Sequence, residues 1–258
     1  MCELMGMSAN VPTDICFSFA GLMQRGGRTG PHRDGWGVVF YEGKGYRLFR
    51  DAMPSSESEL AGLLRELPIK SCTVISHIRK ATRGKITLEN THPFVRELWG
   101  RSWCFAHNGT LKGVRRRSLD FYRPIGTTDS EHAFCWLMNA LRSRFARPPR
   151  PTTFWRQVYS LARELDTLGS FNFLLSDGRY LGAYCSTHLS WLTRCAPFGA
   201  AELIDDELRV DFAMVTQPTD VVTVVATRPL TRNEIWTTMA PGSMTVFADG
   251  RPWLSLGS

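Results

Sequence analysis

WGVVFYEGKGYRLFR, residues 36–50, contains two apolar and aromatic runs on either side of the turn sequence Glu42-Gly43-Lys44-Gly45. β-Branched and aromatic residues are typical of strands, and glycines between two such runs are typical of a hairpin turn. We therefore predict strands over 36–41 and 46–50. Because a hairpin joins neighbouring antiparallel strands, this stretch predicts an antiparallel sheet.

The rest of the chain adds further strands and a few helices. Apolar residues spaced by three and four predict helices over 14–24, 57–67, 129–145 and 153–165. Strand-like runs occupy 72–79, 102–107, 171–176, 180–185, 189–193, 209–214, 221–227 and 243–247. A second hairpin is predicted at Asp177-Gly178. Strands and helices do not alternate regularly, so we predict an α+β sandwich and a single domain over 1–258.

Composition excludes several classes of protein. Hydrophobic residues make up 43% of the chain, which excludes a disordered protein. No apolar run approaches the roughly 20 residues of a membrane-spanning helix, and the N-terminus lacks the basic region of a secretory signal. Seven cysteines occur without C-x-x-C spacing, so neither a disulfide framework nor a zinc ribbon is expected. We therefore expect a cytoplasmic protein.

The formal net charge of +7 arises within residues 101–150, where ten Arg and Lys oppose three Asp and Glu. The preferred interpretation is a solvated loop and helix face, because no aromatic side chains alternate with the basic ones. An alternative is a catalytically silent binding protein whose basic stretch holds an acidic partner or nucleic acid. Salt-dependent binding would distinguish it.

Cys2 follows the initiator methionine directly. Aminopeptidases remove Met1 when the second side chain is small, which would leave Cys2 with a free α-amino group beside its thiol. The amine has an ordinary pKa of about 8 and the thiol one of about 8.5. A single residue can then supply both a nucleophile and a base. On its own, a cysteine at this position indicates no function.

Three further motifs carry polar groups at predicted strand ends and helix starts. Asn108-Gly109 could aim two N–H donors at one point, as an oxyanion hole requires, although a simple turn has the same sequence. Arg79 ends a predicted strand, and its planar guanidinium suits a carboxylate. Asp129 falls in the first turn of a predicted helix, where the helix dipole stabilises a carboxylate. Each motif alone has an ordinary structural explanation.

Together, and in this order, the motifs resemble the type 2 glutamine amidotransferase family, over essentially the whole chain. The matching residues are Cys2, Asp34-Gly35-Trp36-Gly37, His77-x-Arg79-x-Ala81-Thr82-x-Gly84, Thr91-His92-Pro93-Phe94, His107-Asn108-Gly109 and Thr128-Asp129-Ser130-Glu131. The resemblance implies an N-terminal-nucleophile hydrolase fold, which is a four-layer αββα sandwich with antiparallel sheets.

The resemblance also implies a role for each matching residue. Cys2 would attack the side-chain amide of glutamine, and Asn108 with the Gly109 N–H would form the oxyanion hole. The implied substrate-binding residues are Arg79 for the α-carboxylate, Asp129 for the α-ammonium group and Thr82 as part of the pocket lining. A free amino acid carries one negative and one positive charge, which agrees with the positive charge of Arg79 and the negative charge of Asp129.

The chain departs from the family pattern beside two of these residues. Family members fused to synthase domains commonly have glycine after the nucleophile, where this chain has Glu3. Lys80 follows Arg79, and Arg83 follows Thr82. Two additional cations at the rim of the pocket would suit a longer or more anionic γ-glutamyl substrate.

The histidines lack the spacing and carboxylate-rich surroundings of metal ligands, so neither a metal nor a cofactor is expected. His77 and His107 are expected to order the strands near the site through hydrogen bonds.

The sequence therefore predicts an amidohydrolase that cleaves a γ-glutamyl amide through a thioester on Cys2 and releases glutamate and ammonia. A separate partner chain would use the ammonia, because the chain has no room for a synthase domain. The alternative enzyme is a γ-glutamyl hydrolase that acts on a glutathione-like or γ-glutamyl-thiol compound. The expected partners are a small molecule, glutamine or a γ-glutamyl compound, and a separate acceptor or peptidase-type protein. Neither a membrane nor nucleic acid is expected as a partner.

Overall fold

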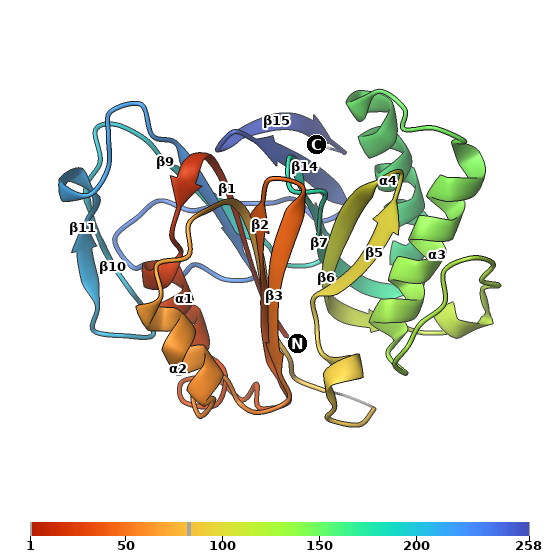
Figure 1. Ribbon diagram of the computed structural model, residues 1–258, viewed down its shortest axis with the longest axis horizontal. Coiled ribbons are helices and arrows are strands. Elements are labelled where there is room, and N and C mark those ends of the chain that lie inside the picture. The colour runs from red at the N-terminus through yellow and green to blue at the C-terminus, as the bar shows by residue number, and fades with distance from the viewer. Residues whose placement is uncertain (1, 82–83, 258) are drawn as a thin grey trace.

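Residues 2–81 and 84–257 are described by the computed structural model. They form two antiparallel sheets stacked face to face, with a pair of helices on each outer face (Figure 1). This arrangement is the four-layer αββα sandwich, so the predicted fold class is confirmed. No helix in the described part of the chain is long and apolar enough to cross a membrane.

The order of strands places the N-terminal strand at the centre of the larger sheet. This seven-stranded sheet has the order β13 (Thr237–Thr238), β9 (Ser190–Arg194), β12 (Val222–Ala226), β1 (Glu3–Thr13), β4 (Ser71–Ile78), β2 (Trp36–Glu42) and β3 (Gly45–Asp51). The six-stranded sheet has the order β15 (Arg251–Leu256), β14 (Ser243–Ala248), β8 (Leu181–Cys185), β7 (Gly169–Ser176), β6 (Arg101–Leu111) and β5 (Phe94–Leu98).

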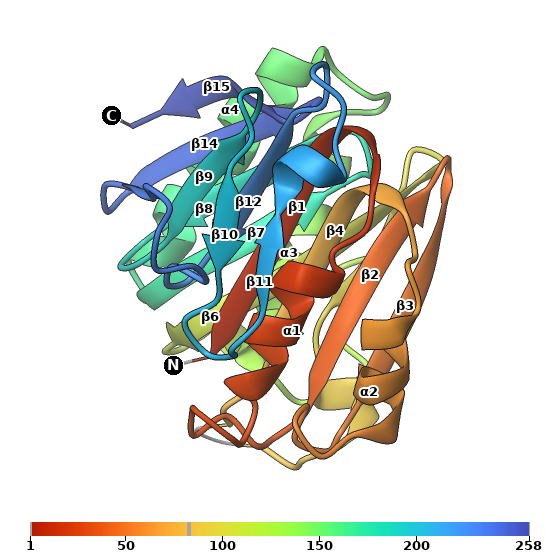
Figure 2. The same cartoon turned by 90° about the vertical axis from the view of Figure 1, so that its left-hand side faces the viewer.

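Each sheet has its own helices. The seven-stranded sheet is covered by α1 (Cys16–Gln24) and α2 (Glu59–Glu66), and the six-stranded sheet by α3 (Asp129–Arg144) and α4 (Pro151–Asp166). A two-stranded ribbon, β10 (Ala200–Glu202) with β11 (Arg209–Asp211), lies beside α1 (Figure 2). Short 3₁₀ helices occur at Leu88–Asn90, Val114–Arg116 and Phe212–Met214.

Apolar side chains fill the spaces between the layers. Between the sheets, Leu4 of β1 packs in one cluster with residues that include Val39, Ile75, Leu174 and Phe247. The layer between the six-stranded sheet and its helices is rich in aromatic residues, including a stacked pair, Phe105 and Phe134, whose ring centroids lie 4.9 Å apart. Burial of this apolar surface provides the main stabilisation of the sandwich.

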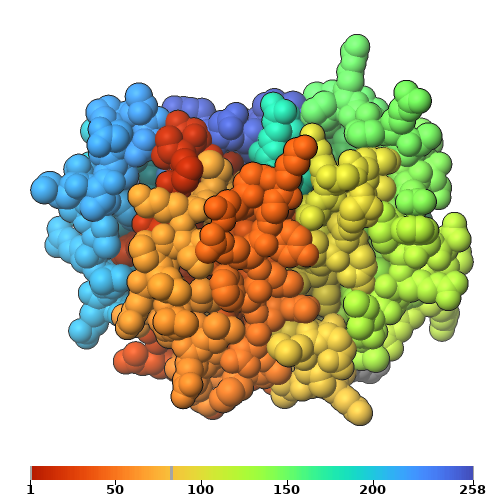
Figure 3. All heavy atoms as spheres, in the orientation of Figure 1, coloured from red at the N-terminus to blue at the C-terminus, as the bar shows by residue number. Residues whose placement is uncertain are grey.

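Both predicted hairpins are present. In the first, Glu42 pairs with Gly45, and Gly43 has a φ of 58°, a backbone conformation that glycine adopts without strain. The resulting β3 is an edge strand, and it forms the surface at the centre of the face seen in Figure 3. The second hairpin joins β7 to β8.

One predicted strand is shorter than expected, and five strands were not predicted: β1, β5, β10, β13 and β15. The strand expected over 209–214 ends at Asp211, because the Asp211 side chain accepts a hydrogen bond from Ala213 N at 3.0 Å and begins a 3₁₀ helix there. The longest strand that the sequence did not predict is β1. Its first seven residues are buried on both faces, so they lack the alternation of apolar and polar residues that indicates a strand.

Candidate active site

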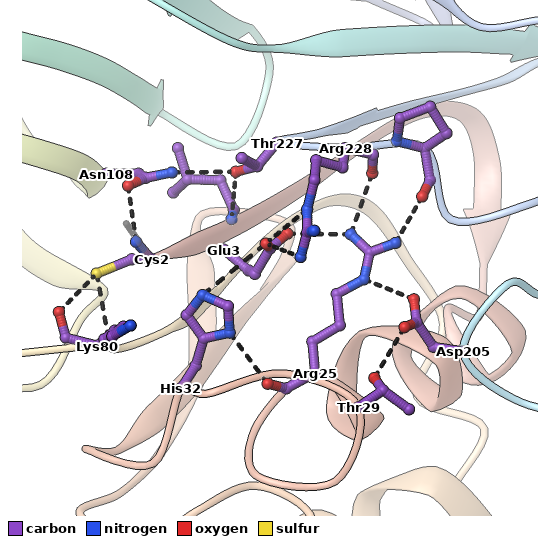
Figure 4. Close-up of polar contacts among 12 residues, drawn as sticks. Cys2, Glu3, Arg25, Thr29, His32, Lys80, Asn108, Asp205, Thr227 and Arg228 are labelled. Atoms are coloured by element: carbon purple, nitrogen blue, oxygen red, sulfur yellow. Dashed lines mark hydrogen bonds and ion pairs between the residues drawn. The ribbon is translucent and has the colours of Figure 1, made fainter.

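Cys2 lies immediately before the central strand β1, where it meets the facing sheet. Its backbone nitrogen donates a hydrogen bond to Asn108 Oδ1 at 2.8 Å, and Asn108 belongs to β6 of the other sheet (Figure 4). Antiparallel pairing of β1 with β4 places Glu3 opposite Ile78, so the end of β4 also lies beside Cys2. The first residue after Met1 is thus in contact with two of the motifs singled out in the sequence.

The Cys2 sulfur is held by the backbone of Lys80. The Lys80 N–H donates to Sγ at 3.3 Å, and the thiol lies 3.5 Å from the Lys80 carbonyl oxygen. Burial raises the pKa of the Cys2 thiol above its ordinary value, while the Lys80 N–H and the positive charge of Arg79 act in the opposite direction. The thiol is therefore protonated at neutral pH, and its use as a nucleophile requires a base.

Asn108 is fully buried and held from several sides. Its backbone carbonyl accepts a hydrogen bond from Asn172 Nδ2 at 3.1 Å, and its own Nδ2 donates to Thr227 Oγ1 at 3.3 Å. An amide nitrogen carries two N–H groups, and Thr227 is the only acceptor that the described residues offer it. At Gly109 a Cβ atom would lie 1.9 Å from the Ser170 carbonyl oxygen, so this position requires glycine.

Arg79 is buried at the end of β4, with 3% of its surface exposed. Its Nη1 donates to the carbonyl oxygens of Lys85 at 3.1 Å and Asp34 at 3.4 Å, and no described carboxylate lies within 4 Å of it. Burial lowers its pKa, and the nearby Cys2 and Asp34 act in the opposite direction. A buried guanidinium without an anionic partner suits an anionic ligand.

The motif that begins at Asp34 holds Arg79 in place. Arg79 N donates to Gly35 O at 2.8 Å, and Asp34 N donates to Arg79 O at 3.1 Å. The Asp34 carboxylate accepts a hydrogen bond from Ala81 N at 2.7 Å. Gly35 has a φ of 111°, and a Cβ at Gly37 would lie 2.3 Å from the His92 carbonyl oxygen, so both glycines of the motif are required.

Asp129 is the first residue of α3, and its carboxylate ties this helix to β6 by accepting from Leu111 N at 2.8 Å. Within the described residues it has no ion-pair partner. The start of α3 lies near Arg79, because a Cβ on Gly84 would be 3.6 Å from Arg79 Nη2 and 3.8 Å from Thr127 Oγ1. Thr82 and Arg83 lie outside the described residues.

Three histidines lie buried behind the site. His77 Nε2 donates to His107 O at 3.1 Å, and His107 Nδ1 lies 2.8 Å from Ser130 Oγ. The rings of His77 and His92 are 4.1 Å apart. Burial lowers the pKa of His77 to about 3, and it also lowers the pKa values of His92 and His107. These side chains are therefore neutral at pH 7, in a position to order strands as the sequence suggested for His77 and His107.

Sequence reasoning did not identify two features of this region. One is a cavity of about 520 Å³ beside Cys2, whose lining includes Lys80, His188 and Arg228. The other is a buried ion-pair network around Glu3 (Figure 4). The presence of Glu3 in place of the usual glycine was the only signal of the network.

Comparisons with known proteins indicate one family. Residues 1–257 match the family model described as class-II glutamine amidotransferases. YafJ of Escherichia coli (strain K12) is 58% identical over 251 residues, which cover 97% of this chain and 98% of YafJ. The uncharacterized protein MJ1515 of Methanocaldococcus jannaschii is 35% identical over 97% of this chain and 70% of its own length.

Solved structures extend the comparison to the fold. The 2.0 Å crystal structure of a predicted glutamine amidotransferase from Pseudomonas aeruginosa PA01 has 50% sequence identity and a TM-score of 0.78, covering 98% of this chain and 100% of that one. A phosphoribosylpyrophosphate amidotransferase from B. subtilis has 16% identity and a TM-score of 0.62. It covers 99% of this chain and 49% of that one, and it supports the fold alone.

The buried neutral His77 predicts a measurable loss of stability in acid. Unfolded histidine has a pKa of about 6.5, so between pH 7 and 5 the unfolded state gains a proton that the native state, with its pKa of about 3, does not. The free energy of unfolding therefore decreases as the pH is lowered from 7 to 5, and His77 accounts for about 2 kcal/mol of this decrease. In urea titrations at pH 7 and pH 5, the wild type should lose about 2 kcal/mol more than His77→Gln. Equal losses in the two proteins would mean that His77 is protonated in the native state.

Proposed function

Because the chain belongs to the class-II glutamine amidotransferase family, we propose that it cleaves a γ-glutamyl amide through a thioester on Cys2 and releases glutamate. The observation that carries this proposal is the position of Cys2 between Asn108 and the end of β4, with its backbone nitrogen 2.8 Å from Asn108 Oδ1. Removal of Met1 would turn that nitrogen into a primary amine in the same position.

The α-amino group of Cys2 acts as the base in this proposal. The thiol is protonated at neutral pH and needs a proton acceptor. His77 and His107 have lowered pKa values and are engaged with backbone or side-chain oxygens. The amine takes the thiol proton as Sγ attacks the γ-carbonyl carbon. It returns the proton to the departing nitrogen, so that ammonia leaves when the substrate is glutamine.

Asn108 and Gly109 stabilise the tetrahedral intermediate. The second N–H of the Asn108 amide and the Gly109 N–H donate to the oxygen that becomes negatively charged when the thiol attacks. Because Asn108 is buried and fixed by Asn172 and Thr227, this donor is oriented before the substrate binds. Water then attacks the thioester carbonyl, which breaks the C–S bond, releases glutamate and regenerates the thiol.

Arg79 and Asp129 bind the two charged ends of the glutamyl group. Arg79 pairs with the α-carboxylate and Asp129 with the α-ammonium group, and Thr82 contributes to the same pocket. The two side chains lack ion-pair partners among the described residues, which supports a zwitterionic ligand. We further propose that residues 1–258 act as one amidotransferase domain in the cytoplasm, and that a separate partner chain receives the ammonia.

The cavity beside Cys2 favours a second candidate, a hydrolase for γ-glutamyl compounds larger than glutamine. Its volume of about 520 Å³ exceeds what ammonia requires, and Lys80, His188 and Arg228 contribute to its lining. A leaving group that carries an anion would fit Lys80, since Arg228 already pairs with Glu3, which lines the same cavity. In this candidate the chemistry at Cys2 is unchanged, and only the amine that departs is different.

Substitution of Cys2 tests the proposal. Glutamate release from glutamine and from a γ-glutamyl dipeptide should be measured for the wild type, Cys2→Ala and a control, Cys195→Ala, which changes an exposed cysteine. We expect Cys2→Ala to lose release from both compounds while its thermal unfolding stays close to that of the wild type. Turnover that persists in Cys2→Ala would refute the mechanism. The compound with the higher kcat/KM decides between the two candidates.

The assignment of Arg79 is tested by a two-by-two comparison. Wild type and Arg79→Ala are each assayed on a γ-glutamyl anilide and on its α-carboxamide analogue, which lacks the carboxylate. A charge-assisted hydrogen bond contributes about 1.5–3 kcal/mol, so Arg79→Ala should lower kcat/KM about 10–150-fold on the first compound and much less on the second. Arg33→Ala, which changes an exposed arginine, is the control. An equal loss on both compounds would show that Arg79 does not bind the carboxylate.

A further inference from the structure

The carboxylate of Glu3, the residue after Cys2, is buried in a network of charges. Glu3 is 2% exposed. Its Oε1 accepts hydrogen bonds from Nε and Nη2 of Arg228 at 3.0 and 2.7 Å, and its Oε2 accepts from Nη1 of Arg25 at 3.0 Å (Figure 4). Glu3 and Arg228 also line the cavity beside Cys2, so this network borders the candidate site.

Arg25, which follows α1, connects Glu3 to three other points. Its Nε donates to Asp205 Oδ2 at 2.6 Å, Nη1 donates to Arg228 O at 3.2 Å, and Nη2 donates to Pro229 O at 2.5 Å. Two carboxylates and two guanidinium groups thus balance one another. The contacts bring together β1, the end of α1, the loop after β10 and residues 228–229.

The network continues to Asn108 through Thr227. Thr227 directly precedes Arg228, and its Oγ1 accepts hydrogen bonds from Leu4 N at 2.9 Å and from Asn108 Nδ2 at 3.3 Å. Thr227 N donates in turn to Leu4 O at 3.1 Å. A short chain of contacts therefore runs from the Glu3 carboxylate, through Arg25 and Arg228, to the amide of Asn108.

Stability alone does not account for this network. Desolvation of buried charges offsets much of their attraction, and apolar replacements of buried ion pairs are often as stable or more stable. The network also lies close to Asn108, whose orientation matters directly for the proposed reaction. Its contacts hold the segment that orients Asn108, which is what a positioning role requires.

We propose that Glu3 is a positioning residue: through Arg25 and Arg228 it fixes Thr227, and Thr227 orients the Asn108 amide toward the bond under attack. This inference rests on the proposed function. It concerns the rate of the chemical step, because the orientation of an oxyanion donor acts on charge that develops in the transition state.

The test is a double-mutant cycle on glutamate release from glutamine. Glu3→Gln keeps the size of the side chain and removes its charge. Misplacement of a catalytic group by about 1 Å can lower a rate 100-fold, so we expect kcat to fall about 10–100-fold, with KM changed less than about threefold. In a Thr227→Ala background, where the link to Asn108 is already broken, Glu3→Gln should lower kcat less than about threefold.

A purely structural role predicts a different pattern. Loss of folded protein would lower kcat by the same factor in both backgrounds, and this result would overturn the inference. Thermal unfolding of each variant gives the folded fraction, and Glu57→Gln, at an exposed ion pair with Arg33, is the matched control for removal of a carboxylate. If Glu3→Gln does not fold, Arg228→Gln replaces it, since the Arg228 side chain is 59% exposed.

Failure of the proposed function gives a separate result. If the wild type releases no glutamate, the proposed function is wrong, and crystal structures of the wild type and Glu3→Gln then decide the inference. We expect Asn108 Nδ2 to lose its contact with Thr227 Oγ1 in Glu3→Gln. An Asn108 side chain that keeps its orientation in the variant would overturn the positioning role.

Discussion

The hydrogen bond between Cys2 N and Asn108 Oδ1 is the contact on which the rest of the site depends. It joins the residue just before the central strand of one sheet to β6 of the other, so it forms only when the two sheets are packed in the correct register. The sandwich is therefore a means of holding two residues 106 positions apart at a distance of 2.8 Å. The helices act on the site indirectly, through the strands that they cover.

Polar groups surround this contact. Arg79 lies at the end of the neighbouring strand β4, and the Glu3 network borders the same cavity as Cys2. Buried polar groups are costly unless they have partners, and the described residues provide these for Asn108 and Glu3 but offer Arg79 no carboxylate. Asn108 and Glu3 thus have hydrogen-bond partners within the protein, whereas the charge of Arg79 suits a ligand.

Local patterns predicted local structure well. The hairpin over 36–50 and the helix predicted over 129–145 depend on neighbouring residues, and both are present. The central strand β1 has no alternation because both faces are buried, and the contact between Glu3 and Arg228 spans 225 positions. Such long-range pairing leaves no pattern in a single sequence, so the site could be approached only through its resemblance to a family.

The central claim is that the mature protein begins at Cys2 and uses its thiol as a nucleophile. Intact-mass measurement of the protein purified from its native host, before and after treatment with an electrophilic glutamine mimic, tests it most directly. We predict loss of the Met1 mass and the addition of one label, which peptide mapping locates on Cys2 alone. Retention of Met1 in a fully active protein, or labelling that is unchanged in Cys2→Ala, would contradict the account.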